Sequence, residues 1–175
     1  MPANSKQINV DERNVITELL KNSKISPDNI AKKYGYSRNR VQRIIKKLEK
    51  NRAIWGYHAV VSDEQLGLKR YFILIKKTIT PVSKDKLDIV ITRRLKKEIG
   101  KIGVFIDCSF FLHGSFDWLI CLSACDVKYV KKFIEIFNEL FQVHVSKIEV
   151  LEVIFPVEKC GFDNQNLEEI KEFFR

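Results

Sequence analysis

The chain has 175 residues, of which 45% are hydrophobic and 30% charged, with a formal net charge of +9. This composition predicts a globular protein of one or two domains. A disulfide framework and a membrane-spanning class are excluded, because the four cysteines form no C-x-x-C pair and no run approaches the ~18 apolar residues of a span.

The positive charge is concentrated in the first third of the chain. Residues 1–62 carry 13 basic and 5 acidic side chains, whereas residues 63–175 carry 18 and 17. We therefore predict a polyanion-binding module over residues 1–62, joined by a linker over 63–70 to a nearly neutral module.

Three helices are predicted in the first module. The first begins at Asp11, taken as its N-cap, and runs to about Lys21. The second begins at Ser26-Pro27 and ends at Gly35, and the third runs from Arg38 to about Lys50 after Ser37 as the cap. Helical spacing places one apolar stripe on the inner side of the third helix: Val41, Ile44, Ile45 and Leu48.

The close succession of the second and third helices through a glycine turn is typical of a helix-turn-helix, whose second helix enters the major groove of DNA. Arg can bond guanine bidentately, Asn and Gln can bond adenine, and lysines further along suit phosphates. The alternative is an ordinary solvated helix face, but such faces usually mix acids with bases. The predicted DNA contacts are Ser37, Arg38, Asn39, Arg40, Gln42, Arg43, Lys46 and Lys47.

After the third helix, the Ile, Trp, Tyr and Val content of residues 53–61, with one glycine, predicts two short strands. In a winged helix-turn-helix such strands form the wing. The predicted first domain, residues 1–62, is therefore a winged helix-turn-helix DNA-binding domain.

Residues 10–68 resemble the DNA-binding domain and linker of the Lrp/AsnC family of transcriptional regulators. The resemblance rests on Asp-Glu-Arg at 11–13, Ile-Ser at 25–26, Gly-x-Ser at 35–37, and the later Ile-x-Gly-Tyr and Val-Val-x-x-x-x-Leu-Gly segments. Three positions depart from the family: Ile44 replaces a usual basic residue, Asn14 replaces a frequent aspartate, and Arg52 replaces a usual glycine. We expect Asn51 to supply the left-handed turn instead.

The pattern of the second module predicts, in chain order, a strand, a helix, two strands, a helix and a final strand. Strands are predicted at 71–75, 104–112, 116–123 and 145–155. One helix is predicted from Ser83 to about Gly100 with Leu87, Ile91 and Leu95 inward, and another after Asp126. This order predicts a ferredoxin-like βαββαβ domain over residues 71–156, so the fold class is α+β. Residues 157–175 are predicted to be a helical tail, with Leu167, Ile170, Phe173 and Phe174 as its apolar pattern.

The same resemblance extends to the family's C-terminal effector domain through the segment HGSFDWLICL, residues 113–122. It implies sheets that pair into homodimers, a possible octamer, and a small effector, commonly an amino acid, bound near the hairpin at 113–115. An aspartate can pair with an ammonium group, and a tight glycine turn exposes N–H groups to a carboxylate. The alternative is a plain turn with an exposed acid. The predicted effector residues are His113, Gly114, Ser115 and Asp117.

These features predict a cytoplasmic, sequence-specific regulator of transcription that binds double-stranded DNA. No signal peptide is expected at Met1–Gln7, and no catalytic residue, metal or cofactor is predicted, because the three histidines lack ligand spacing and no nucleotide-binding loop is present. Two alternatives stay open. One is an architectural DNA-binding protein with little sequence preference, and the other is an enzyme resembling the sirohaem decarboxylases related to this family.

Overall fold

The computed structural model describes residues 8–92 and 94–174, so Met1–Gln7 lies outside the described residues. The chain divides into two compact units. One holds the chain up to Val60 together with Cys160–Phe162, and the other holds Val61–Lys159 and the chain from Asp163 onward. In the described part, no helix is long and apolar enough to cross a membrane.

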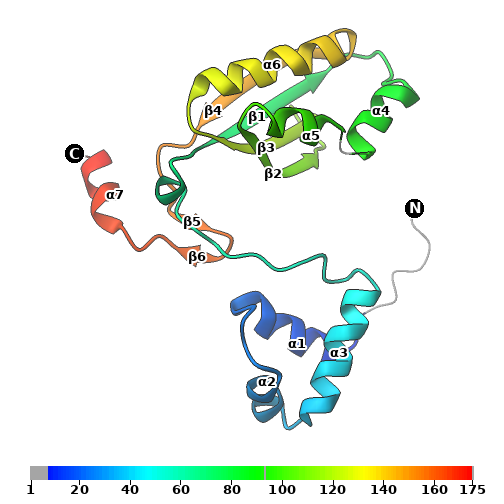
Figure 1. Cartoon of the computed structure of the whole chain (residues 1–175), viewed down its shortest axis with the longest axis vertical. Helices are drawn as coiled ribbons and strands as arrows, with labels where there is room; N and C mark the ends of the chain where they lie inside the picture. Colours follow the sequence, from blue (N-terminus) through cyan, green and yellow to red (C-terminus); the bar gives the residue numbers. More distant parts are fainter. Residues whose placement is uncertain (1–7, 93, 175) are drawn as a thin grey trace. The chain divides into compact units, whose positions relative to one another are not determined.

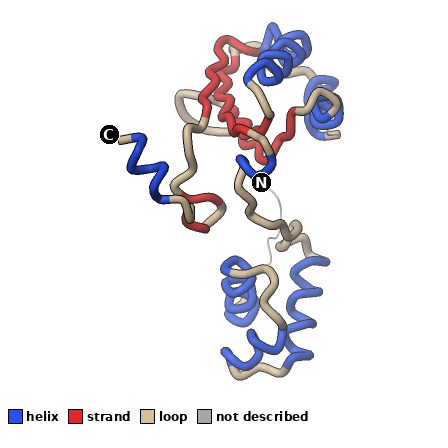
Figure 2. Tube along the Cα trace, turned by 60° about the vertical axis from the view of Figure 1, so that its left-hand side comes forward, coloured by secondary structure: helices blue, strands red, loops and turns tan. Residues whose placement is uncertain are grey.

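The first unit is a bundle of three helices: α1 (Val10–Lys21), α2 (Pro27–Tyr34) and α3 (Arg38–Lys50). Figure 2 shows them as three short rods joined by tight turns. Its core contains Val15, Ile30 and the predicted stripe of α3, in which Val41, Ile44 and Leu48 are buried and Ile45 is half-buried. The predicted inner face of α3 is therefore confirmed.

The ends of these helices follow from capping chemistry. Ser26 and Ser37 cap α2 and α3 as predicted, and Gly35 ends α2 with a left-handed φ of 68°. The prediction of Asp11 as the cap of α1 is wrong, because the cap is Asn9. The Asn9 side chain accepts from the Glu12 N–H at 2.9 Å, and Glu12 accepts from the Asn9 N–H in return.

The segment after α3 differs from prediction in two ways. Asn51 has an ordinary φ of −82°, and Arg52 itself adopts the left-handed φ of 57° where the related family has glycine. Residues 53–61 contain no strand. Within the described residues, no neighbouring strand pairs with them through a backbone ladder. The predicted wing strands are therefore wrong for this structure.

The second unit contains a four-stranded antiparallel sheet in the order β2-β3-β1-β4. Its elements, in chain order, are β1 (Lys69–Lys77), α4 (Lys84–Ile91), α5 (Arg94–Gly100), β2 (Val104–Phe111), β3 (Trp118–Ala124), α6 (Val127–Phe141) and β4 (Val145–Glu152). This order and topology confirm the ferredoxin-like fold and the α+β class.

Helices α5 and α6 lie over one face of the sheet (Figure 1). Alternate residues of β1 and β3 point into the core beneath them, where Tyr71, Ile73, Ile120 and Phe133 are fully buried. On the opposite face of the sheet, apolar side chains such as Phe72, Leu74 and Leu119 are half-exposed.

Three local predictions are corrected. The single helix predicted over 83–100 is two helices, and Leu87 and Ile91 are exposed rather than inward. The β-branched run Ile89-Val90-Ile91-Thr92 disfavours continuing the helix, and Thr92 ends α4. Strand β4 ends at Glu152, which pairs with Tyr71, and not at Phe155; beyond it only the Val153 N–H bonds β1, donating to the Arg70 carbonyl at 2.9 Å.

The tail contains a short hairpin, β5 (Glu158–Lys159) with β6 (Phe162–Asp163), that sequence reasoning missed, followed by the predicted helix α7 (Leu167–Phe173). The side chains of Leu167 and Phe173 lie outside the described residues. Phe174 is 79% exposed and Ile170 is half-buried.

Candidate nucleic-acid interface and effector site

Helix α3 presents three groups of polar side chains around its buried stripe. The outward group consists of Asn39, Arg43 and Lys46, spaced four and three residues apart and therefore on one face. All three are exposed. Within residues 8–92 and 94–174, none of them takes part in a hydrogen bond or ion pair through its side chain. This outward face of α3 is therefore free to meet a polyanion.

The side of α3 toward α1 carries cations that are already paired. Arg40 forms an ion pair with Asp11, and Lys47 forms one with Glu12 at 2.6 Å. The Glu12 side chain is only 8% exposed, and hydrogen bonds from Lys47 and from the Asn9 N–H lower the pKa of its carboxyl. Lys47 therefore neutralises a buried carboxylate, which is a structural role.

On the side of α3 toward α2, Arg38 lies 3.6 Å from the Asp28 carboxylate, and both side chains are at least half exposed. Gln42 is half-buried, and the Ser37 hydroxyl accepts from the Arg40 N–H at 3.2 Å as the helix cap. The eight predicted contacts thus all lie on or beside the exposed part of α3. Within the described residues, the three of the outward group are both exposed and without an internal partner for their side chains.

An acid inside the helical bundle fixes α2 against α1. Glu18, a buried residue of α1, accepts from Lys33 at 2.9 Å and from the Tyr34 hydroxyl at 3.1 Å, and it pairs with Lys21. These donors, Lys33 first, lower the pKa of Glu18 to about 2. Sequence reasoning missed this cluster. The signal was present, since Glu18 lies three residues after the buried Val15 and therefore on the inner face of α1.

The predicted effector turn lies between β2 and β3. His113, Gly114 and Ser115 are exposed, and their backbone N–H groups donate no hydrogen bond to any described residue. Gly114 does not have a positive φ, and a Cβ there would meet nothing within 4 Å. The turn therefore does not depend on glycine, contrary to the prediction.

Asp117 is positioned by the strands beside this turn. Its Oδ2 accepts from the Lys77 N–H at 2.9 Å and lies 3.8 Å from the Lys76 ammonium. The Lys77 N–H is the main cause of a lowered pKa for this carboxyl. Its side chain remains 29% exposed. The structure thus brings a charged carboxylate and three unpaired N–H groups to one end of the sheet.

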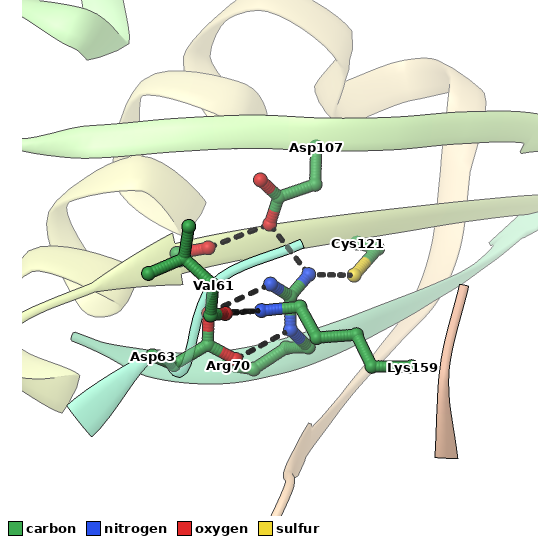
Figure 3. A network of polar contacts seen from close by, with 7 residues as sticks. Val61, Asp63, Arg70, Asp107, Cys121 and Lys159 are labelled. Carbon is green, nitrogen blue, oxygen red and sulfur yellow. Dashed lines mark hydrogen bonds and ion pairs between the residues drawn. The ribbon is translucent and has the colours of Figure 1, made fainter. Parts of the chain in front are cut away.

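A second polar network, not foreseen from sequence, lies on the outer face of the sheet (Figure 3). Arg70 donates to both oxygens of Asp63 at 2.9 Å, to Asp107 at 2.7 Å and to the Cys121 sulfur at 3.3 Å. Lys159 reaches Asp63 at 2.7 Å and the Val61 carbonyl at 2.8 Å. The network joins the linker segment and the tail to the sheet.

In the described part of the chain, no group of three or more His, Cys, Asp or Glu side chains is arranged to hold a metal ion. The groups of polar side chains and N–H groups described above are the outward face of α3, the effector turn and the Arg70 network.

Residues 12–54 match a family model described as winged helix-turn-helix DNA-binding. A curated relative, the proline dehydrogenase transcriptional activator of Rhodobacter capsulatus, is 26% identical over 125 residues, which cover 71% of this chain and 77% of the relative.

Two solved structures share the fold of the whole chain. One is an AsnC family transcriptional regulator from Agrobacterium tumefaciens, with a TM-score of 0.63 and 16% identity, covering 93% of this chain and 99% of the other. The other is a transcriptional regulator of Neisseria meningitidis in complex with L-Met, with a TM-score of 0.64 and 17% identity, covering 87% of this chain and 94% of the other. The chain therefore contains a winged helix-turn-helix DNA-binding domain over residues 12–54 and has the fold of solved structures of the Lrp/AsnC family.

Proposed function

We propose that this protein is a transcriptional regulator that binds specific double-stranded DNA sites by placing α3 in the major groove, with Asn39 and Arg43 contacting bases and Lys46 contacting phosphate. The observation that carries the proposal is the outward face of α3, which is exposed, cationic and without internal partners, directly opposite the buried stripe. Arg38, Arg40 and Lys47 flank this face but are held by carboxylates.

Selection of bound fragments from random DNA would first define the preferred site. Arg43→Ala should then weaken binding to that site and relax the preference at one base pair, at a cost of about 1–3 kcal/mol. Arg94→Ala is the matched control, because Arg94 is an exposed arginine of α5 in the other unit. Equal affinity and selectivity for wild type and Arg43→Ala would exclude the proposed face.

The predicted homodimer has a candidate surface on the outer face of the sheet. By strand register this face carries half-exposed apolar side chains from all four strands, namely Phe72, Leu74, Phe105, Phe110, Leu119 and Leu151. We propose that two copies pair through this face, because an apolar patch of this kind marks an interface. A two-fold dimer would favour near-palindromic sites with half-sites about one DNA turn apart.

Sedimentation velocity tests this surface. Phe110→Glu should shift the protein toward monomer, since Phe110 is 53% exposed and a charge there would be buried at the interface. Ile79→Glu is the control, because Ile79 is fully exposed in the loop after β1 and outside this face. An octamer, which the family resemblance also implies, would appear in the same measurement as a larger species.

We propose that an amino acid is the effector and that it binds at the turn formed by His113, Gly114 and Ser115. The three unpaired N–H groups suit a carboxylate, and the Asp117 carboxylate suits an ammonium group. The L-Met complex of the Neisseria meningitidis neighbour supports this ligand class. Binding here would act on DNA affinity only through a preference for one conformation of the chain.

Calorimetry against L-Met and the other common amino acids tests the site. Asp117→Asn should abolish binding of the amino acid while leaving DNA affinity in its absence largely intact, because the amide keeps an acceptor for the Lys77 N–H. Asp85→Asn, an exposed acid of α4, is the control. If wild type bound none of the amino acids, the effector proposal would fail while DNA recognition could still stand.

We further propose that the predicted division of labour holds, with residues 1–62 binding DNA and residues 71–156 binding effector and partner. As a DNA-bound regulator the protein needs no catalytic step, and its place of action is the cytoplasm of a bacterial or archaeal cell, where the chromosome lies.

A further inference from the structure

Arg40 is held by a small cluster at the junction of α1 and α3. Its guanidinium pairs with the Asp11 carboxylate, and the guanidinium carbon lies 4.7 Å from the centre of the Tyr36 ring. The Tyr36 hydroxyl donates to the other Asp11 oxygen at 2.8 Å and accepts from the Asn14 amide at 3.1 Å. Both oxygens of Asp11, the Nη2 of Arg40 and one face of its guanidinium are therefore occupied within the protein.

Arg43 provides an internal comparison. It is also an exposed arginine of α3, but within the described residues it has no carboxylate partner. A guanidinium binds a phosphate with the same N–H edge that it uses for a carboxylate. Arg40 can therefore use its Nη2 for a DNA phosphate only by breaking its ion pair with Asp11, whereas Arg43 has no such pair to break.

We propose that Asp11 occupies on Arg40 the place of a DNA phosphate and so sets the sequence-independent part of the protein's DNA affinity. Tyr36 is the positioning residue, since its hydroxyl orients Asp11 and its ring supports Arg40. This inference rests on the proposed placement of α3 along DNA. It adds that Asp11, in the first turn of α1, keeps the predicted contact residue Arg40 from binding a DNA phosphate.

Salt dependence measures the number of phosphates that the protein neutralises, with about 0.9 in the log–log slope for each contact. Arg40→Met should leave the slope and the affinity for non-cognate DNA nearly unchanged. Asp11→Asn should steepen the slope by about 0.9 and raise the affinity for non-cognate DNA on the order of five- to ten-fold at about 0.1 M salt, because Arg40 becomes available.

The double variant Asp11→Asn/Arg40→Met separates this effect from the simple loss of a negative charge. It should return to the affinity of Arg40→Met, because the gain requires a free Arg40. Tyr36→Phe should give a smaller gain of the same kind, since it removes only the hydroxyl that holds Asp11. Thermal unfolding of each variant verifies that the bundle is folded at the temperature of the titration.

Three results would overturn the proposal: an unchanged slope in Asp11→Asn, a gain that persists in the double variant, or a slope that falls by about one in Arg40→Met alone. None of these depends on Arg43→Ala. Loss of affinity in Arg43→Ala together with any of the three would refute the withholding of Arg40 while leaving the placement of α3 intact. Full affinity in Arg43→Ala would refute the placement itself.

Discussion

The two units of the chain use arginine in opposite ways. In the helical unit the acids Asp11, Asp28 and Glu12 pair with cations at the sides of α3, and its outward face keeps unpaired cations. In the sheet unit, Arg70 is 17% exposed and is satisfied by Asp63 and Asp107, with Lys159 completing a neutral network. The unpaired cations on the outward face of α3 are available for a polyanion, whereas Arg70 and Lys159 stabilise the fold of the sheet unit.

The largest effect should follow from breaking the internal network. Arg70→Met leaves Asp63, whose side chain is 15% exposed, with Lys159 as its remaining partner. Burial by itself raises the pKa of Asp63, and Arg70 and Lys159 together lower it. Removing one partner of a buried ion pair costs about 3 kcal/mol or more, so denaturant unfolding should show a loss of that size.

Arg43→Met is the matched change in the other unit and should alter the free energy of unfolding by less than about 0.5 kcal/mol, because an exposed, unpaired side chain contributes little. Comparable losses in Arg70→Met and Arg43→Met would remove the distinction between structural and available arginines.

The pH dependence of stability tests the role of the buried acid Glu18 in the helical unit. The pKa of Glu18 lies at about 2, below its ordinary value of 4.5, because Lys33, Lys21 and Tyr34 donate to it. The contribution of the charged Glu18 carboxylate to the stability of the folded protein is therefore complete above about pH 4.5 and is lost as the pH falls toward 2. Thermal unfolding followed by circular dichroism should show wild type more stable than Glu18→Gln at neutral pH, with the difference disappearing toward pH 2. A constant difference across that range would contradict the role assigned to the Glu18 carboxylate.

A smaller effect on stability concerns Arg52, which follows the C-cap of α3. Arg52 adopts a φ of 57°, which costs an L-residue about 1–2 kcal/mol relative to ordinary helical backbone. Arg52→Gly should raise the free energy of unfolding by about 1 kcal/mol, partly offset by the greater freedom of glycine in the unfolded chain. Asn51→Gly is the control and should not stabilise, because Asn51 has a φ of −82°.

Much of the candidate interface was predictable because it is local. Spacing alone identified the buried stripe of α3 and hence its exposed face, and Ser37 and Gly35 fixed where the helices begin and end. The pairing of Arg40 with Asp11 was not predictable in this way, because 29 residues separate the two and only the packing of α1 against α3 brings them together.

The same distinction holds in the sheet unit. Alternation and turn signals predicted the four strands of the main sheet but not the hairpin of β5 and β6, and they extended β4 past Glu152, where its register with β1 ends. Pairing with a neighbouring strand, and not the local pattern, sets such an end. The predicted wing strands failed for the same reason, since a strand exists only with a paired neighbour.

The sequence by itself determined the helices of the DNA-binding domain, the βαββαβ order and the concentration of positive charge, because periodicity, capping and composition are properties of short segments. Only the tertiary structure decided which cations are paired and which are available, because ion pairs such as Arg40 with Asp11 and Arg70 with Asp107 join residues that are distant in the chain. A Coulombic interaction depends on separation in space, and folding sets that separation.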